Sequence, residues 1–218
     1  MSTLHVTLPD GVGVDISEYD REPELTETLA DLAGAYALRS RPTTLAMVAE
    51  VLLARAKARL GDDPEGAAED LSAALDVAAH VGEPDLTAEL YGVRAQALAV
   101  LDGDRRALVD YDLAVELAPS NPSYRNNRSV SRRKLGDLSG AVADARRAVG
   151  EKADSWLYWL TLGEALATRG DAETAAVVRH AHRINPTIGR YLADPVFDTV
   201  RDCPEFPRSS PDTEERPS

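Results

Sequence analysis

The sequence WLYWLTLGEALATRGDAETAAVVRHAHRINPT at residues 156–187 decides the fold, because two similar stretches precede it at a constant spacing. Residues 122–155 (PSYRNNRSVSRRKLGDLSGAVADARRAVGEKADS) begin 34 positions earlier, and residues 88–121 (AELYGVRAQALAVLDGDRRALVDYDLAVELAPSN) begin another 34 before that. A period near 34 residues is typical of helix pairs that stack on copies of themselves, because one pair cannot bury its own apolar face. The sequence therefore predicts an all-α fold, a right-handed α-solenoid of antiparallel helix pairs.

Small side chains recur at matched places in the three stretches, which is what close approach of paired helices requires. The matched sets are Ala95, Ser129 and Gly163; then Ala107, Ala141 and Ala175; then Ala114, Ala148 and Ala181. A turn lies between the helices of each pair, at Asp102-Gly103, Gly136-Asp137 and Gly170-Asp171. We expect the glycines to adopt the backbone conformation that ends a helix.

These residues resemble the tetratricopeptide repeat family, whose signature places a large residue, Leu-Gly, a small Ala, an aromatic residue, another Ala and a closing Pro at set positions. The last stretch carries Trp159, Leu162-Gly163, Leu166, Ala175 and Pro186. The first carries Tyr91, Ala107, Tyr111, Ala114 and Pro119. The middle stretch departs from the pattern, since it has Arg125, Arg128 and Arg132 at usually apolar or mixed positions and lacks the closing proline.

We divide the chain into four parts on this basis. An acidic N-terminal segment, 1–22, precedes a helical repeat domain at 23–187, a capping helix at 188–206 and a disordered tail at 207–218. The repeats lie near 47–84, 88–121, 122–155 and 156–187, and a further helix over 24–39 covers the start of the stack.

The two ends of the chain follow different patterns. Leu4, Val6 and Leu8 alternate, as do Val12, Val14 and Ile16, with Pro9-Asp10-Gly11 between them, and this predicts a short β-hairpin. The hairpin is interpreted as an arm packed on the first helices, with a strand offered to a partner or a second copy as the alternative. Asp194-Pro195 predicts the start of the closing helix.

Composition places the chain among intracellular proteins without an evident active site. No apolar run is long enough to cross a membrane, no secretion signal is visible, and the single cysteine, Cys203, fits a reducing compartment, so we expect a cytoplasmic protein. His180 and His182 lie two positions apart, on different faces of a helix, and cannot share a metal. Catalytic and phosphate-binding motifs are absent from the sequence, so we expect no enzyme activity, no metal and no cofactor.

Charge is distributed unevenly along the chain. The formal net charge of −13 argues against a general nucleic-acid binder. Residues 1–31 hold eight acids and one base, whereas residues 122–155 hold eight bases and four acids. This contrast suggests that the acidic segment could fold back onto its own basic repeat, a hypothesis that deletion of residues 1–22 would test.

The resemblance implies that the first helix of each pair lines a concave groove. Mapping the family's groove positions onto this sequence gives Arg55, Arg59, Gln96, Ser123, Asn126, Asn127, Arg133, Lys134, Leu160 and Glu164. Amides can bind a peptide backbone, and cations favour a carboxylate. The family's clamp for a chaperone's C-terminal carboxylate is matched only at Asn127, so chaperone-tail binding is not expected.

The leading functional hypothesis is a non-enzymatic adaptor that binds a peptide or protein segment, with an acidic character, in this groove. Two alternatives remain open at this point. One is self-association, by stacking of solenoid ends or exchange of the hairpin. The other is an accessory or regulatory subunit for a separately encoded enzyme.

Overall fold

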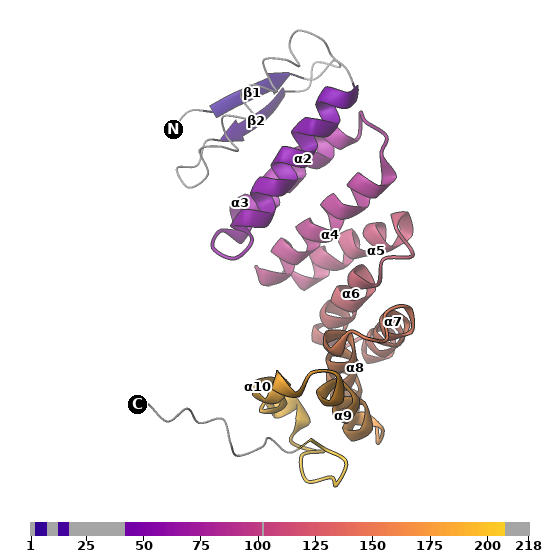
Figure 1. Cartoon of the computed structure of the whole chain (residues 1–218). Coiled ribbons are helices and arrows are strands. Elements are labelled where there is room, and N and C mark those ends of the chain that lie inside the picture. Colours follow the sequence, from indigo (N-terminus) through magenta and orange to yellow (C-terminus); the bar gives the residue numbers. More distant parts are fainter. Residues whose placement is uncertain (1–2, 8–12, 18–41, 102, 208–218) are drawn as a thin grey trace, which may run out of the picture. The chain divides into compact units, whose positions relative to one another are not determined.

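The computed structural model describes residues 3–7, 13–17, 42–101 and 103–207, and all structural statements concern these residues. Most of them are helical (Figure 1). The longer helices are α2 (Pro42–Arg59), α3 (Pro64–Ala78), α4 (Pro84–Val100), α5 (Asp104–Leu117), α6 (Pro122–Lys134), α7 (Leu138–Glu151), α8 (Trp156–Arg169) and α9 (Thr174–Ile184). None of the described helices is long and apolar enough to span a bilayer.

The chain divides into two compact units, which are described separately. Unit 1 is Met1–Tyr124 and unit 2 is Arg125–Ser218, so the boundary falls within α6. The sequence predicted one repeat domain over 23–187. In unit 1, α2 packs on α3, α3 on α4, and α4 on α5; in unit 2, α7 packs on α8 and α8 on α9. Each helix therefore contacts mainly its sequence neighbours, as expected of stacked hairpins.

Local sequence signals begin these helices. Proline stands in the first turn of both α3 and α4, where its missing N–H is not needed. The Asp63 carboxylate accepts a hydrogen bond from the Gly66 N–H at 3.0 Å, and the Asp137 carboxylate accepts one from the Gly140 N–H at 2.9 Å. The same capping arrangement thus starts the second helix of two different hairpins, α3 and α7.

The recurring small residues lie in the helix interfaces, as the sequence predicted. All nine are buried, and Ala107, Ala141 and Ala175 occupy equivalent places at the beginning of α5, α7 and α9. Gly163 shows why size matters here, because a Cβ on this residue would lie 2.6 Å from Cγ2 of Val178. The close approach of α8 and α9 therefore depends on a residue without a side chain.

Two of the three turn glycines behave as predicted. Gly136 and Gly170 have φ values of +85° and +84°, in the left-handed region that ends a helix with little strain only at glycine. Gly103 differs, since its φ is −93°. There the requirement is steric, because a Cβ would lie 2.8 Å from the carbonyl oxygen of Leu98.

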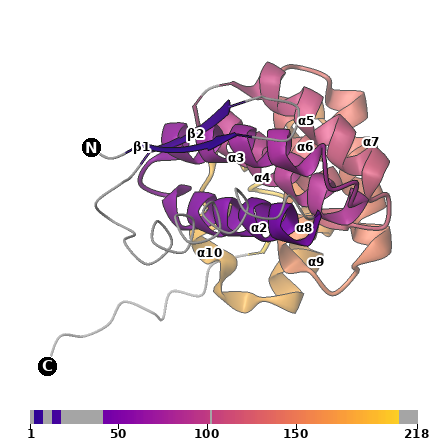
Figure 2. The same ribbon diagram turned by 90° about the horizontal axis from the view of Figure 1, so that it is seen from above.

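The N-terminal β-hairpin is present. Strands β1 (Thr3–Thr7) and β2 (Gly13–Ser17) pair antiparallel with Leu4 opposite Ile16 and Val6 opposite Val14. β2 lies beside α3, as Figures 1 and 2 show from two directions. The predicted turn at 9–11 and the helix predicted over 24–39 lie outside the described residues.

The C-terminal end closes with short turns in place of the single capping helix that was predicted. These are η1 (Pro186–Ile188), α10 (Gly189–Leu192) and η2 (Pro195–Phe197). The Asp194 carboxylate caps η2 by accepting a hydrogen bond from the Val196 N–H at 2.9 Å. Ile188, Leu192 and Phe197 are buried with residues of α8 and α9, so these turns cover the apolar side of the last hairpin. The tail predicted at 207–218 lies outside the described residues except for Pro207.

Candidate protein-binding site

In two successive hairpins, α4–α5 and α6–α7, an arginine–aspartate pair joins the two helices of the hairpin. The pair occupies the same repeat position in both. Arg94 of α4 donates two hydrogen bonds to Asp110 of α5, at 2.7 and 2.8 Å. Arg128 of α6 does the same to Asp144 of α7, with both distances 2.7 Å. Such two-bond pairing fixes geometry as well as charge. Hydrogen bonding to Asp110 raises the pKa of Arg94.

The first hairpin uses its arginines in the same way, which corrects two of the predicted groove residues. Arg55 is 0% exposed and Arg59 is 6% exposed. Arg55 Nε donates to Asp70 at 2.9 Å, and Arg59 Nη1 donates to the same carboxylate at 2.7 Å. Both guanidinium groups therefore hold α2 against α3 and do not line a surface. A buried charge of this kind is tolerated because it is paired and hydrogen-bonded.

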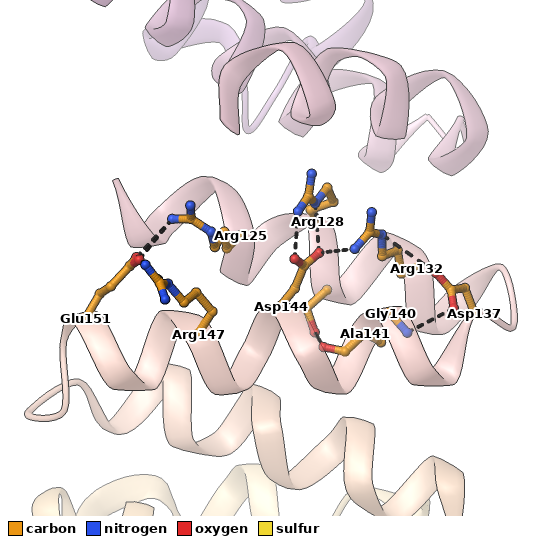
Figure 3. Close-up of polar contacts among 10 residues, drawn as sticks. Arg125, Arg128, Arg132, Asp137, Gly140, Ala141, Asp144, Arg147 and Glu151 are labelled. Carbon is orange, nitrogen blue, oxygen red and sulfur yellow. Dashed lines mark hydrogen bonds and ion pairs between the residues drawn. The ribbon is translucent and has the colours of Figure 1, made fainter. Parts of the chain in front are cut away.

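Three of the eight basic residues of 122–155 are likewise directed inward (Figure 3). Arg125, Arg128 and Arg132 lie on one side of α6 and face α7. Arg132 Nη1 lies 2.8 Å from Asp144, and Arg125 Nη1 lies 3.0 Å from Glu151. Ser129 adds a hydrogen bond at 2.8 Å from its hydroxyl to the carbonyl oxygen of Ala141. These three arginines thus stabilise the α6–α7 hairpin.

A second side of α6 lies opposite the arginines that bond α7. Asn127, Val130 and Lys134 follow one another at helical spacing and are half-buried or exposed. The equivalent positions of α8, 34 residues later, include Leu157, which is 45% exposed, and Glu164, which is half-buried. We call Asn127, Val130, Lys134, Leu157 and Glu164 the α6–α8 surface.

An ion pair connects the two helices of this surface. Arg133 Nη2 lies 3.0 Å from Glu164 Oε2, and both side chains are about a fifth exposed. Burial raises the pKa of Glu164, the nearby Asp194 raises it further, and attraction to Arg133 only partly opposes both effects. The predicted residues Arg133 and Glu164 are therefore brought together by the fold.

The two predicted asparagines have different surroundings. Asn126 is 4% exposed, and its Nδ2 donates to Asn127 Oδ1 at 3.3 Å. Its own Oδ1 is buried without a hydrogen-bond partner among the described residues. Asn126 thus orients the amide of Asn127, which is the one of the pair nearer the surface. Leu160, also predicted, is 2% exposed and belongs to the apolar cluster around Ile188.

The remaining predicted groove residues, Gln96 and Ser123, lie in unit 1. Gln96 is half-buried on α4, and Ser123 is exposed near the start of α6. The residues that sequence reasoning missed are the aspartates Asp70, Asp110 and Asp144 and, beside Glu164, Asp194. The aspartates had a signal in the sequence, because each follows an arginine by 15 or 16 positions, from the first helix of a hairpin to the second.

The described residues hold no cluster of three or more metal-binding side chains. His180 stacks on Trp159 with ring centroids 4.2 Å apart, and its Nδ1 contacts Arg183 Nη2 at 2.5 Å. Cys203 is half-buried beside the C-terminal apolar cluster. His180 and Cys203 therefore both pack against neighbouring side chains.

Comparisons with known proteins agree with the repeat geometry. Over 61 residues, the chain is 43% identical to Tetratricopeptide repeat protein 36 of Mus musculus. This part of the chain is similar to a tetratricopeptide repeat protein. The match covers 28% of this chain and 31% of the mouse protein, so it spans about a third of that protein's length. No family model matches the chain.

Solved structures show a similar fold over most of the chain. One crystal structure of MamA superposes with a TM-score of 0.56 at 16% identity, covering 78% of this chain and 96% of that one. Another superposes with a TM-score of 0.58 at 13% identity, covering 82% and 100%. The predicted all-α solenoid of helix hairpins is confirmed.

Proposed function

We propose that this tetratricopeptide chain is a non-enzymatic scaffold that binds an extended protein segment on the α6–α8 surface of unit 2. The observation that carries the proposal is that the two sides of α6 have different surroundings. Its Arg125, Arg128 and Arg132 side is used against α7. Its Asn127, Val130 and Lys134 side continues onto α8 and keeps polar, apolar and cationic groups at the surface.

The chemistry of this surface suits a peptide with a carboxylate near one end. The amide of Asn127 has donors for peptide carbonyl oxygens, because its Oδ1 already accepts from Asn126. Lys134 is exposed two turns further along the same side of α6, and a cation at this position favours a carboxylate. Val130 and the exposed Leu157 add apolar area to be covered. An acidic segment is therefore the partner class that we propose.

Affinity capture from the native cell extract tests the proposal when wild type and variants are compared side by side. The variant Asn127→Ala with Lys134→Glu should lose the captured partner by about tenfold or more, since it removes an amide contact and reverses a charge. Lys152→Glu is a matched control in the same unit, because Lys152 is exposed at the end of α7, a helix that contributes no residue to the α6–α8 surface.

Binding of the identified partner should then be measured at two salt concentrations. A contact between Lys134 and a carboxylate should weaken as salt rises, because exposed charge pairs are screened. A partner that binds the double variant as tightly as the control variant would place the binding surface elsewhere on the chain.

A further inference from the structure

A surface groove in unit 1 is built differently from its counterpart in unit 2. Helices α3 and α5 both pack on α4, and two adjoining hollows of about 280 and 370 Å³ lie between them. Both hollows are lined by Ala68, Ser72, Leu98 and Arg106. The apolar floor of the groove is formed by Ala68 of α3 and Leu98 of α4.

The corresponding junction of unit 2 is filled by side chains. By repeat position, Ala68 corresponds to Val142 and Val109 corresponds to Val177. Val142, Val177 and their neighbours Leu162 and Leu166 are buried in one cluster. Val109 is 61% exposed, whereas Val177 is 8% exposed. The α3–α5 groove therefore leaves open the same place that unit 2 closes with its own side chains.

The two walls of the α3–α5 groove carry opposite charges. Glu65 and Glu69 line it from α3, and Arg106 lines it from α5 with Arg105 next to it. All four side chains are exposed, and none of them forms an ion pair within residues 42–101 and 103–207. The other charged groups that line it, Arg94 and Asp110, are bonded to each other.

This arrangement is self-complementary. Helices α3 and α5 run in the same direction, because each is antiparallel to α4, which lies between them. A two-fold axis along the groove would place α3 of one copy over α5 of the other, as a symmetric interface requires. The acidic wall of each copy then meets the basic wall of its partner, and the exposed Val109 and Leu101 face the partner's apolar floor.

We propose that the α3–α5 groove is a homodimer interface, occupied by the same groove of a second copy of this chain. Each copy carries a net charge of −13, so the two copies repel each other at long range. Contact between the opposite walls offsets this repulsion locally. The dimer is therefore reversible, with a dissociation constant on the order of micromolar.

Sedimentation velocity of the full chain over a range of concentrations tests the proposal. Arg105→Glu with Arg106→Glu makes both walls acidic, and Glu65→Lys with Glu69→Lys makes both walls basic. Each double variant should raise the dissociation constant about tenfold or more, because attraction becomes repulsion. Mixing the two variants should restore a dimer, since every acidic wall then meets a basic one.

A matched control is Lys152→Glu with Arg179→Glu, which changes the net charge as much as the arginine variant does but on exposed side chains of unit 2. Circular dichroism establishes that all variants are folded. A wild type that stays monomeric at several hundred micromolar overturns the proposal. Equal weakening by the control, or folded variants that remain monomeric when mixed, overturns it as well.

Discussion

The hairpins α6–α7 and α8–α9 occupy equivalent repeats of unit 2, yet they are held together by different chemistry. In α6–α7, Arg128 and Arg132 both bond Asp144. The equivalent positions in α8–α9 are Leu162, Leu166 and Val178, all of which are buried. The backbone arrangement is shared although the ion pairs are not. The small residues common to both hairpins therefore specify the repeat, and the layer between the helices accepts either charge or hydrocarbon.

This difference has an energetic consequence. A buried ion pair gains Coulomb energy but loses hydration, so its net contribution is small while the loss of one partner is large. In an apolar layer, removal of one side chain leaves no unpaired charge behind, because each side chain is buried independently. The α6–α7 hairpin should therefore be more sensitive than α8–α9 to single substitutions in this layer.

The largest effect is expected for Asp144→Ala. The substitution leaves the guanidinium groups of Arg128 and Arg132, which are 13% and 24% exposed, without their shared carboxylate. We expect the free energy of unfolding to fall by about 3 kcal/mol. Urea denaturation followed by tryptophan fluorescence measures it, because both tryptophans, Trp156 and Trp159, lie in unit 2.

Asp154→Ala is the matched control, since Asp154 is exposed in the loop after α7. It should change the free energy of unfolding by no more than about 0.5 kcal/mol. Equal losses in the two variants would show that the Asp144 pairs contribute nothing specific to the hairpin.

A smaller loss, about 2 kcal/mol, is expected for Gly163→Ala, because the new Cβ would lie 2.6 Å from Cγ2 of Val178. The equivalent position of α6 is Ser129, which is accommodated by its bond to Ala141. Adding Val178→Ala should recover part of the loss by making room. By contrast, Gly150→Ala in α7 should stabilise by about 0.5–1 kcal/mol, since nothing lies within 4 Å of the new Cβ. If both glycine variants lost stability alike, the contact with Val178 would not be the cause.

The repeat fold could be predicted from the sequence because its determinants are local and periodic. Ala107, Ala141 and Ala175 recur at intervals of 34 residues, and all are buried as expected. The roles of the arginines could not be predicted from the same pattern. Arg55 and Arg59 occupy groove positions by family alignment, but their partner Asp70 lies on the other helix of the hairpin. Which side of a helix a long charged side chain takes depends on that partner, which a repeat pattern alone does not identify.

Copying the last hairpin into the previous one tests the comparison directly. Arg128→Leu, Arg132→Leu and Asp144→Val together give α6–α7 the layer that α8–α9 has. The free energy of unfolding of the triple variant should lie within about 1 kcal/mol of the wild-type value, because a buried ion pair and a well-packed apolar layer differ little in net free energy. The same fluorescence-detected urea titration applies. If the triple variant lost as much free energy of unfolding as Asp144→Ala does, the ion pairs of Arg128 and Arg132 with Asp144 would stabilise this hairpin more than an apolar layer can.

The smallest expected effect concerns the ion pair between the two hairpins, Arg133 with Glu164. Burial and Asp194 raise the pKa of Glu164 in the folded chain, so the folded state binds this proton more tightly than the unfolded state does. Stability from this group is then fully present below the ordinary glutamate pKa, near 4.5, and is lost as pH rises through the raised value. Glu164→Gln has no carboxyl group to titrate at this position. The free energy of unfolding of this variant relative to wild type should therefore be greatest at pH 7 and should decrease as pH falls toward 4.5.

Arg133→Gln sharpens this test, because it removes the attraction that lowers the pKa of Glu164. The pKa should rise further in this variant, and its unfolding free energy should fall over a wider pH range than that of wild type. Asp194→Asn should act in the opposite direction by removing a like charge. Parallel pH profiles for wild type and all three variants would mean that Glu164 titrates alike in the folded and unfolded chain. The pair would then join the hairpins only as an exposed ion pair does, with little net effect on stability.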